Sequence, residues 1–482
     1  MRLAPFSRAA VVAASTLLAL TAASATSATA ATPTGPLPPA NPYAGPLGTS
    51  TMHGDTASSD ATPLPGPAAG TLSSHRTALQ SACPTVLVGG DGFPVALCTT
   101  IFGRTPTVHL LDPATGDSLA ELALAKGSLL GGVYAYLDNE DRLVAVDGNR
   151  DLLRVAHRRN ASGAWELYVD SRLPLAGAVP DGDSVTGVSP DWQGRVWFAT
   201  GKGVVGTADD RTGVVRSLAL PAGEEVANSI STVPAGTAVS TTHATYLLTA
   251  APDGTPRIAW RKTYERGPGR KPGQLSWGTG STPTFFGPAS GTEYLTIVDN
   301  AAPTVNLLVY RVNDGSLLCS VPVLKAGGSG SENSPVALGT SVFIASTYGY
   351  PYPQLPEGAG TSVPASDDFK GGLSRVDVRP DGSGCDLKWD NRVRSAAVPR
   401  LSTADGELRT VLREPVIPGT TATSIVDPYH YAEIDPETGT VTRTKWLGAG
   451  FVFDTLQMVG SIAPGRVVLQ GTTTGVLRIT AD

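Results

Sequence analysis

The sequence predicts an all-β protein that forms one β-propeller of eight four-stranded blades. Gly and Pro are frequent, with 55 and 39 of 482 residues, whereas only 16% of residues are charged and Met occurs 3 times. Such a turn-rich composition, with strand-forming residues among the apolar ones, favours an all-β fold. One turn motif also recurs along the chain, and one complete four-strand unit can be traced between residues 276 and 350.

The clearest unit begins with a polar turn that leads into a first apolar run. A second run ends at Asp299-Asn300, a third spans residues 305–312, and the turn Asn313–Gly315 leads into a fourth. The pattern starts again at Ser334-Pro335. Four apolar runs joined by short turns are typical of one antiparallel propeller blade.

The recurring turn places Asp or Asn shortly before Gly, which supplies the positive φ that a tight hairpin requires. It lies between two apolar runs and recurs every 42–67 residues, a period typical of propeller repeats. The seven copies are DPATG from 112, NASG from 160, DRTG from 210, PDGT from 252, NDGS from 313, PDGSG from 380 and DPETG from 435.

Closure of the ring is predicted from the two ends of the chain. After the seventh turn three more apolar runs follow, which leaves the last unit one strand short. Residues 71–80, TLSSHRTALQ, are expected to complete it, because pairing the termini removes an unpaired sheet edge. Eight blades are therefore predicted, and seven is the alternative if one unit is irregular.

Residues 1–30 have the features of a secretory signal peptide. Arg2 and Arg8 precede the apolar residues 9–20, and Ala28-Thr29-Ala30 forms a small-residue cleavage site. The apolar run is shorter than the ~20 residues that a membrane span needs, so a retained anchor is the weaker alternative. A secreted, extracellular protein is expected.

The mature chain is expected to have two parts. Residues 31–70 are rich in Ala, Thr, Pro and Gly, which predicts a low-complexity segment that begins with a flexible stretch. Residues 71–482 form the predicted propeller. The net charge is −6 without any Lys/Arg run, which disfavours nucleic-acid binding. No later stretch resembles a membrane span, and we expect a monomer.

The four cysteines allow three disulfide connectivities, and export permits disulfides. We favour Cys83–Cys98, which flank a predicted hairpin turn. We also favour Cys319–Cys385, which occupy equivalent fourth strands of successive units. Free buried thiols are the alternative.

Candidate site residues follow from the propeller prediction, because the loops that lead into the innermost strands converge on one mouth of the channel. Glu332 lies in such a loop and is predicted to act as a general base or a cation ligand, with Asn333 beside it. The alternative is that these side chains only bind turn backbone. Further ligand-binding candidates in this and neighbouring turns are Asn228, Thr279 and Asn300.

Two other stretches supply candidates. His53 and Asp55 belong to a dense polar cluster before the first blade, and His is a plausible acid or base near neutral pH. An ordered segment would bring them to the mouth, whereas a polar tail would not. Asp299 is the third catalytic candidate. Tyr348 begins the long loop 348–370, which is either a lid that binds ligand or a plain surface loop.

The repeat also resembles a known family. The stretches LDPATGDSLAEL and IDPETGTVTRTKWLG are similar to the quinoprotein-dehydrogenase-like (PQQ-like) propeller repeat. The pattern from GTGSTPT through IVDNAAP, SENS and YGY resembles secreted actinobacterial and fungal proteins of that superfamily. The resemblance covers about residues 80–482. It implies a planar quinone and Ca²⁺ held by acidic and Asn side chains in the channel, and a Trp-containing docking repeat. Only Trp260, Trp389 and Trp446 fall near that Trp position, and no vicinal cysteine pair is present.

The sequence thus predicts a secreted propeller that binds a small molecule or a glycan at the channel mouth. Acid/base chemistry of the lyase or hydrolase type by Glu332, Asp299 and His53 would fit these residue types. One alternative is an oxidoreductase that depends on quinone and Ca²⁺, and another is a non-catalytic interaction scaffold in the cell envelope. The sequence does not decide the cofactor, because the docking repeat is incomplete, and fold similarity alone does not give function.

Overall fold

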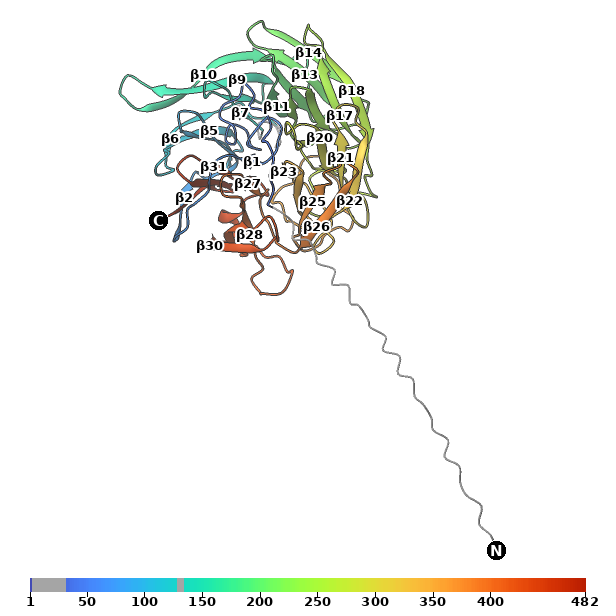
Figure 1. The fold of residues 1–482 in the computed structure, drawn as a ribbon. Coiled ribbons are helices and arrows are strands. Elements are labelled where there is room, and N and C mark those ends of the chain that lie inside the picture. Colours follow the sequence, from blue (N-terminus) through green and yellow to red (C-terminus); the bar gives the residue numbers. More distant parts are fainter. Residues whose placement is uncertain (2–31, 128–133) are drawn as a thin grey trace.

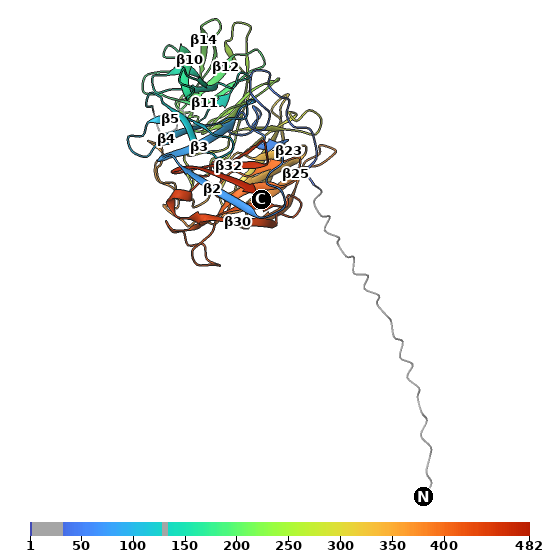
Figure 2. The same cartoon turned by 90° about the vertical axis from the view of Figure 1, so that its left-hand side faces the viewer.

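The computed structural model describes Met1, residues 32–127 and residues 134–482. In this part of the chain, eight β-sheets follow one another around a ring, which Figure 1 shows in sequence order from blue to red. Figure 2 shows the same ring from the side. The prediction of eight blades is confirmed. The predicted signal peptide lies outside the described residues, apart from Met1.

The first four blades are continuous in sequence, and each has its first strand innermost in the ring. Their strands are β3 (Ser81–Val88), β4 (Pro94–Thr100), β5 (Pro106–Leu111) and β6 (Ser118–Ala123); β7 (Tyr136–Leu137), β8 (Leu143–Val146), β9 (Asp151–Arg159) and β10 (Trp165–Pro174); β11 (Val185–Pro190), β12 (Val196–Thr200), β13 (Val204–Asp209) and β14 (Val214–Ala219); and β15 (Ser231–Val233), β16 (Gly236–Ser240), β17 (Ala244–Ala250) and β18 (Pro256–Thr263).

The last four blades include two strands from the N-terminal segment. Their strands are β19 (Thr284–Phe286), β20 (Tyr294–Val298), β21 (Asn306–Arg311) and β22 (Leu317–Pro322); β23 (Val336–Leu338), β24 (Ser341–Ala345), β25 (Leu373–Val378) and β26 (Cys385–Asn391); β1 (Ala61–Thr62), β27 (Arg400–Ser402), β28 (Leu408–Arg413), β29 (Pro428–Ile434) and β30 (Val441–Ala449); and β31 (Ser461–Ala463), β32 (Val467–Thr472), β33 (Gly475–Ala481) and β2 (Leu72–Ala78). In the described residues the one helical element is the 3-10 turn η1 (Phe451–Phe453), and no helix there is long and apolar enough to cross a membrane.

Burial along the strands follows from blade packing. The second strands β12 and β20 are buried at every residue, because each lies between two neighbouring blades. The fourth strands β6 and β22 contain no fully buried residue and vary between exposed and half-buried positions, because they form the rim of the ring. The apolar run that was predicted as the second strand of each unit therefore forms the packed interior between blades.

The repeated turn forms as expected, between the third and fourth strands of a blade. After β5, Asp112 accepts hydrogen bonds at its Oδ1 atom from the backbone N–H groups of Ala114 (2.8 Å) and Thr115 (3.0 Å). The Gly116 N–H donates to the Asp112 carbonyl, and Gly116 has a φ of 85°. A side-chain oxygen that binds its own turn and a Gly in the left-handed region explain why this motif marks the hairpins.

The N-terminal strand closes the ring as predicted. β2 pairs antiparallel with β33 over its whole length, from Leu72 opposite Ala481 to Ala78 opposite Gly475. Figure 1 shows the C-terminus beside β2.

Both predicted disulfides are also confirmed. Cys83–Cys98 joins β3 to β4, and Cys319–Cys385 joins the outer strands β22 and β26 of adjacent blades.

Candidate functional site in the central channel

The N-terminal segment closes one end of the central channel. We call this end, where the first strands of the blades finish, the closed mouth, and the other end the open mouth. Figure 1 places β1 near the centre of the ring. Residues 49–62, the plug, accept backbone hydrogen bonds from the innermost strands of six blades at 2.6–3.1 Å. The donors are the N–H groups of Val88, Leu137, Thr232, Phe285, Ala337 and Leu401, and the acceptors are the carbonyls of Thr49, Ser50, Thr56, Ala57, Ser59 and Asp60.

This arrangement explains why a low-complexity segment is ordered. The innermost strand of each blade is a sheet edge whose N–H groups point into the channel, and buried N–H groups need a partner. The plug supplies carbonyls to those edges one after another. Residues 31–50 were expected to be flexible, but Asn41 binds the Pro190 carbonyl at 2.9 Å and Ala44 pairs with Asp138. The segment is thus part of the propeller.

A cavity of about 320 Å³ lies above the plug and opens at the open mouth. Met52 and His53 of the plug contribute to its lining. The loops that lead into β15 and β23 contribute Asn228, Glu332 and Asn333, as the sequence analysis expected. Much of the remaining lining is apolar, including Ala82, Pro84, Leu275, Val398, Leu456, Met458 and Val459.

Glu332 is buried, at 7% exposure, in this wall. Its Oε1 accepts a hydrogen bond from Asn228 Nδ2 at 3.2 Å, while Oε2 accepts none of normal geometry from the described residues. Burial raises the pKa of Glu332 to about 7, against the smaller opposing effects of the Leu275 N–H, Asn228 and Arg270. A carboxyl with this pKa can hold or release a proton near neutral pH.

Asn228 is fixed in one orientation. Its Oδ1 accepts a hydrogen bond from the Tyr134 hydroxyl at 2.8 Å, and its Nδ2 donates to the Gly280 carbonyl at 2.5 Å as well as to Glu332. Burial raises the pKa of Tyr134, and the neighbouring charge of Glu332 raises it further. The phenol therefore stays protonated and remains a hydrogen-bond donor.

His53 forms a dyad with Asp60 on the floor. His53 Nδ1 lies 3.0 Å from Asp60 Oδ2, and the Ser334 hydroxyl donates to the same carboxylate oxygen at 2.7 Å. A carboxylate on Nδ1 favours the tautomer with the proton there, which leaves Nε2 as a free acceptor. Nε2 is buried without a partner among the described residues. Arg400, 2% exposed, has Nη1 3.5 Å from Asp60 Oδ1 and balances its charge.

Asn333 also lines the cavity and has a fixed partner. Its Nδ2 donates to Gln457 Oε1 at 3.1 Å, and Gln457 Nε2 donates to the Ser395 carbonyl at 3.1 Å. The backbone carbonyl of Asn333 accepts from the Ser281 hydroxyl at 3.2 Å. These contacts join the loops of blades five, six, seven and eight around the open mouth.

Five of the candidates do not line this cavity. Asp299, just after β20, accepts hydrogen bonds from the N–H groups of Ala301 and Asn306 and from Asn306 Nδ2, so it holds its own loop. The other four also hold local backbone or pack on neighbours. Asn300 binds the Arg266 and Gly269 carbonyls, Thr279 binds the Val298 carbonyl, Asp55 binds Ser59, and Tyr348 lies against Lys370.

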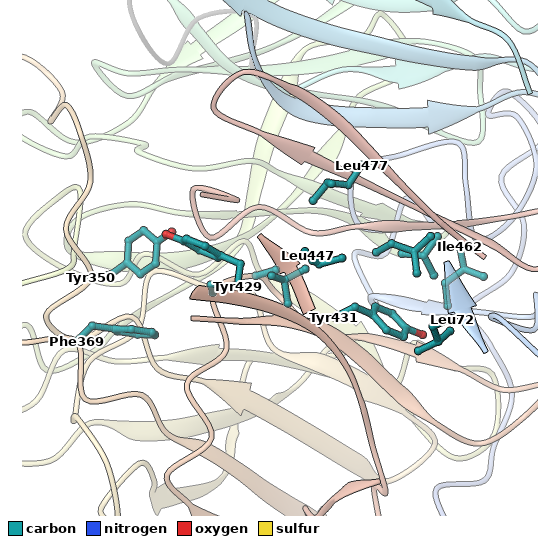
Figure 3. Close-up of a cluster of buried hydrophobic side chains, with 13 residues drawn as sticks. Leu72, Tyr350, Phe369, Tyr429, Tyr431, Leu447, Ile462 and Leu477 are labelled. Carbon is teal, nitrogen blue, oxygen red and sulfur yellow. The ribbon is translucent and has the colours of Figure 1, made fainter. Parts of the chain in front are cut away.

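The long loop 348–370 covers part of the open mouth. Tyr352, Pro353, Gln354 and Pro356 line the cavity. Figure 3 shows the base of the loop, where Tyr350 and Phe369 lie beside Tyr429 of β29 in a buried cluster. The Tyr350 hydroxyl donates to Asp454. This part of the loop therefore lies at the open mouth.

The loop that contains Arg270 forms hydrogen bonds with the loop 348–370. Arg270 donates to the carbonyls of Ala359 at 3.2 Å and Gly360 at 2.8 Å, and the Val363 N–H donates back to the Arg270 carbonyl at 2.7 Å.

Three residues of the site were not predicted from the sequence, namely Tyr134, Tyr352 and Asp60. Tyr134 lies in the loop that leads into β7, the same position as Asn228 and Glu332, so the repeat could have located it. Tyr352 lies in an unusually long loop between β24 and β25, and Asp60 depends on the path of the plug.

The residues present do not fit a Ca²⁺ and quinone pair. Ca²⁺ takes about 6–8 oxygen ligands. In residues 32–127 and 134–482 no group of three or more His, Cys, Asp or Glu is placed to hold a metal ion. Glu332 is the one carboxylate among the described residues that line the cavity, and its Oε1 is bound by Asn228. The described lining also includes no Trp that would stack on a planar ring.

Comparisons with known proteins show the fold. No protein-family model matches the chain, and no curated protein matches it. The quinohemoprotein alcohol dehydrogenase ADHIIG of Pseudomonas putida HK5 is 10% identical, with a TM-score of 0.54 over 90% of this chain and 80% of that chain. A europium-containing methanol dehydrogenase is 11% identical, with a TM-score of 0.48 over 89% and 98%. A streptogramin B lyase is 9% identical, with a TM-score of 0.41 over 85% and 98%. The chain is thus similar in fold to quinone-dependent dehydrogenase propellers, at low identity.

Proposed function

We propose that the channel cavity binds a small organic molecule and that His53 and Glu332 exchange protons with it. The observation that carries this proposal is a pair of buried polar atoms, His53 Nε2 and Glu332 Oε2, that make no hydrogen bond of normal geometry with the described residues and belong to residues that line one cavity. Buried polar atoms normally have partners, and those that lack them mark strain or function. The volume of about 320 Å³ suits a small ligand.

The lining supports a ligand with an apolar body and a hydrogen-bonding group. Leu275, Val398 and Met458 would contact the apolar part, whereas Glu332 and His53 would bind the polar part. A sugar presents hydroxyl groups on most of its edge and would leave many of them unpaired against such walls. The cavity therefore favours an apolar small molecule over a glycan.

The two groups suit complementary roles in acid/base chemistry. His53 Nε2 can accept a proton, because the carboxylate of Asp60 beside Nδ1 orients the ring and leaves Nε2 as the free acceptor. Glu332, with a pKa of about 7, can give a proton to a leaving group. In an elimination, His53 Nε2 takes the proton from carbon, the C–H electron pair forms the new double bond, and the leaving group departs with the proton from Glu332. In a hydrolysis, His53 takes the proton of the attacking water.

Ligand screening by thermal shift tests the proposal. Apolar small molecules with one hydroxyl, amine or amide group are expected to raise the melting temperature of the wild type, and Glu332→Gln is expected to lose most of that gain. Glu407→Gln is the matched control, because Glu407 is a half-buried carboxyl with a partnerless Oε2 that does not line the cavity. An equal gain in Glu332→Gln and the wild type for every ligand would contradict the site.

The other candidate functions receive less support. The quinone-dependent oxidoreductase lacks a fitting ligand set, as described above. A channel filled with side chains would support a scaffold that binds no ligand, but in this structure a cavity remains in the channel. We also propose that the protein is secreted, which two disulfides support because they persist in oxidising compartments.

A further inference from the structure

Exposed apolar side chains gather on the face of the propeller that holds the open mouth. In the described residues, the exposed large apolar side chains other than Met1, Ile258, Leu317 and Trp446 all lie in loops of this face. These loops join second to third strands or lead into first strands. Exposed apolar residues scattered singly need no explanation, but their concentration on one face indicates an interaction surface.

Three of these loops are neighbours and form what we call the apolar crescent, over blades seven, eight and one. The Gly450 N–H donates to the Asp427 carbonyl at 3.0 Å, which joins the loop before β29 to η1. Thr474 of blade eight donates to the Val452 carbonyl at 3.2 Å. Ile101 and Phe451 both line the cavity, which joins η1 to the loop after β4. Its exposed large apolar members are Ile101, Phe102, Val416, Ile417, Ile425, Val426, Phe451 and Val452.

The crescent carries almost no charge. Residues 415–426 and 449–453 contain no Asp, Glu, Lys or Arg, and residues 99–105 contain only Arg104. Asp427, which ends the first of these loops, is fully buried and binds Arg413 at 2.9 Å. The charges beside the crescent are those of the exposed Arg104 and of Lys126, whose Nζ lies near Gly103, so an extended charged partner surface has little to bind here.

The form of the crescent favours a fluid apolar partner. Phe102 and Ile425 are 84% and 85% exposed, so their side chains project into solvent from separate loop tips. Projecting single side chains insert into a lipid surface without needing a complementary pocket, whereas a protein partner must supply one for each. Neutral loops suit a zwitterionic lipid surface, because they neither need nor repel an anionic one.

The position of the cavity favours the same partner. Ile101 and Phe451 of the crescent are 40% and 49% exposed, and they also line the cavity. An apolar molecule dissolved in lipid could therefore reach the cavity along apolar side chains without crossing water. We infer that the apolar crescent docks the propeller onto a neutral lipid surface, with the open mouth facing the lipid. The inference rests on this surface alone and does not require the proposed chemistry.

Flotation with phosphatidylcholine vesicles tests the inference. The full-length mature protein is expected to float with the vesicles. Phe102→Asp combined with Ile425→Asp is expected to lower the partition coefficient at least tenfold, because a charge at each tip opposes insertion. Ile258→Asp combined with Leu317→Asp is the matched control, since both side chains are exposed, at 44% and 53%, on outer strands away from the crescent. The control is expected to float like the wild type, and thermal melts verify that both variants are folded.

Other results would overturn the inference. Wild type that stays with the soluble fraction, or floats only with anionic vesicles at low salt, is not docked by the crescent. A dimer in sedimentation equilibrium that Phe102→Asp dissolves, without vesicle binding, would instead make the crescent an interface between two copies. Failure of the cavity proposal is separate, because Glu332→Gln is expected to float normally even where it abolishes ligand stabilisation.

Discussion

His53 Nδ1 lies 3.0 Å from Asp60 Oδ2, although both residues precede the first blade of the propeller. Ser58 and Asp60 adopt positive φ values of 58° and 53°, which turn the chain so that the carboxylate returns to the imidazole. Asp tolerates this left-handed conformation better than most residues do. The catalytic candidate is therefore oriented by its own segment, and the blades hold that segment through its backbone carbonyls.

Asp60→Asn is expected to destabilise the protein strongly. Asp60 is fully buried, and its charge balances Arg400, which is 2% exposed. Removing one partner of a buried ion pair leaves an unpaired buried charge and costs about 3–5 kcal/mol. Urea unfolding measures the loss. Asp209→Asn, which removes the partner of Arg211 at the surface, serves as the control and is expected to cost about 1 kcal/mol or less.

The stability of the wild type is expected to fall as pH rises from about 4.5 to 7, through Glu332. Burial raises the folded-state pKa of this carboxyl to about 7 from an ordinary value of 4.5. Between these values the folded state keeps the proton and the unfolded state loses it, so the free energy of unfolding decreases with pH. The full effect is on the order of 3 kcal/mol, at 1.36 kcal/mol per pKa unit.

Comparison with Glu332→Gln isolates this contribution. Glutamine does not titrate, so the stability of the variant relative to the wild type is expected to increase from pH 4.5 to 7 and then to stay constant. Asp55, whose pKa burial raises to about 6, contributes a slope of the same sign at lower pH in both proteins and cancels. A difference that does not change with pH would show that Glu332 titrates normally.

The fold was predictable because its signal is local. The turn at Asp112 and Gly116 depends on contacts within five residues, so it can be recognised in the sequence and counted. Its seven copies set the blade number, and the missing strand of the last unit pointed to residues 71–80, within which β2 forms at residues 72–78. Pairing of the plug was not predictable, since it depends on N–H groups from six separate blades.

The site was predictable mainly where the repeat decides position, and His53 was found instead from the polar cluster before the first blade. Glu332, Asn333 and Asn228 share the place of a loop that leads into an innermost strand, so the blade prediction brought them to the mouth. Asp299 lies in a loop of the same face, but hydrogen bonds to the backbone of Ala301 and Asn306 hold its carboxylate away from the cavity. Side-chain direction of this kind has no periodic signal in the sequence.

Removing the disulfides is expected to destabilise the protein unequally. Cys83–Cys98 closes 15 residues and Cys319–Cys385 closes 66. In the chain-entropy model these loops contribute about 3 and about 4 kcal/mol. Urea unfolding of the two double Cys→Ala variants measures both values. Mass analysis of the unreduced wild type after alkylation is expected to find no free thiol, and a labelled cysteine would contradict both bonds.

Arg270→Ala is expected to loosen the loop that covers the open mouth. The guanidinium donates hydrogen bonds to the carbonyls of Ala359 and Gly360. Among the described residues, no other side chain donates a hydrogen bond to these two carbonyls. Hydrogen exchange measured by mass spectrometry is expected to rise in residues 354–366 and to stay unchanged in the blades. Arg266→Ala, which removes a contact with Trp277 on the same face, is the control and should leave that loop protected. If the loop is the cover of a binding cavity, its loosening in Arg270→Ala also increases the dissociation rate of any ligand found in the screen, whereas a plain surface loop would leave that rate unchanged.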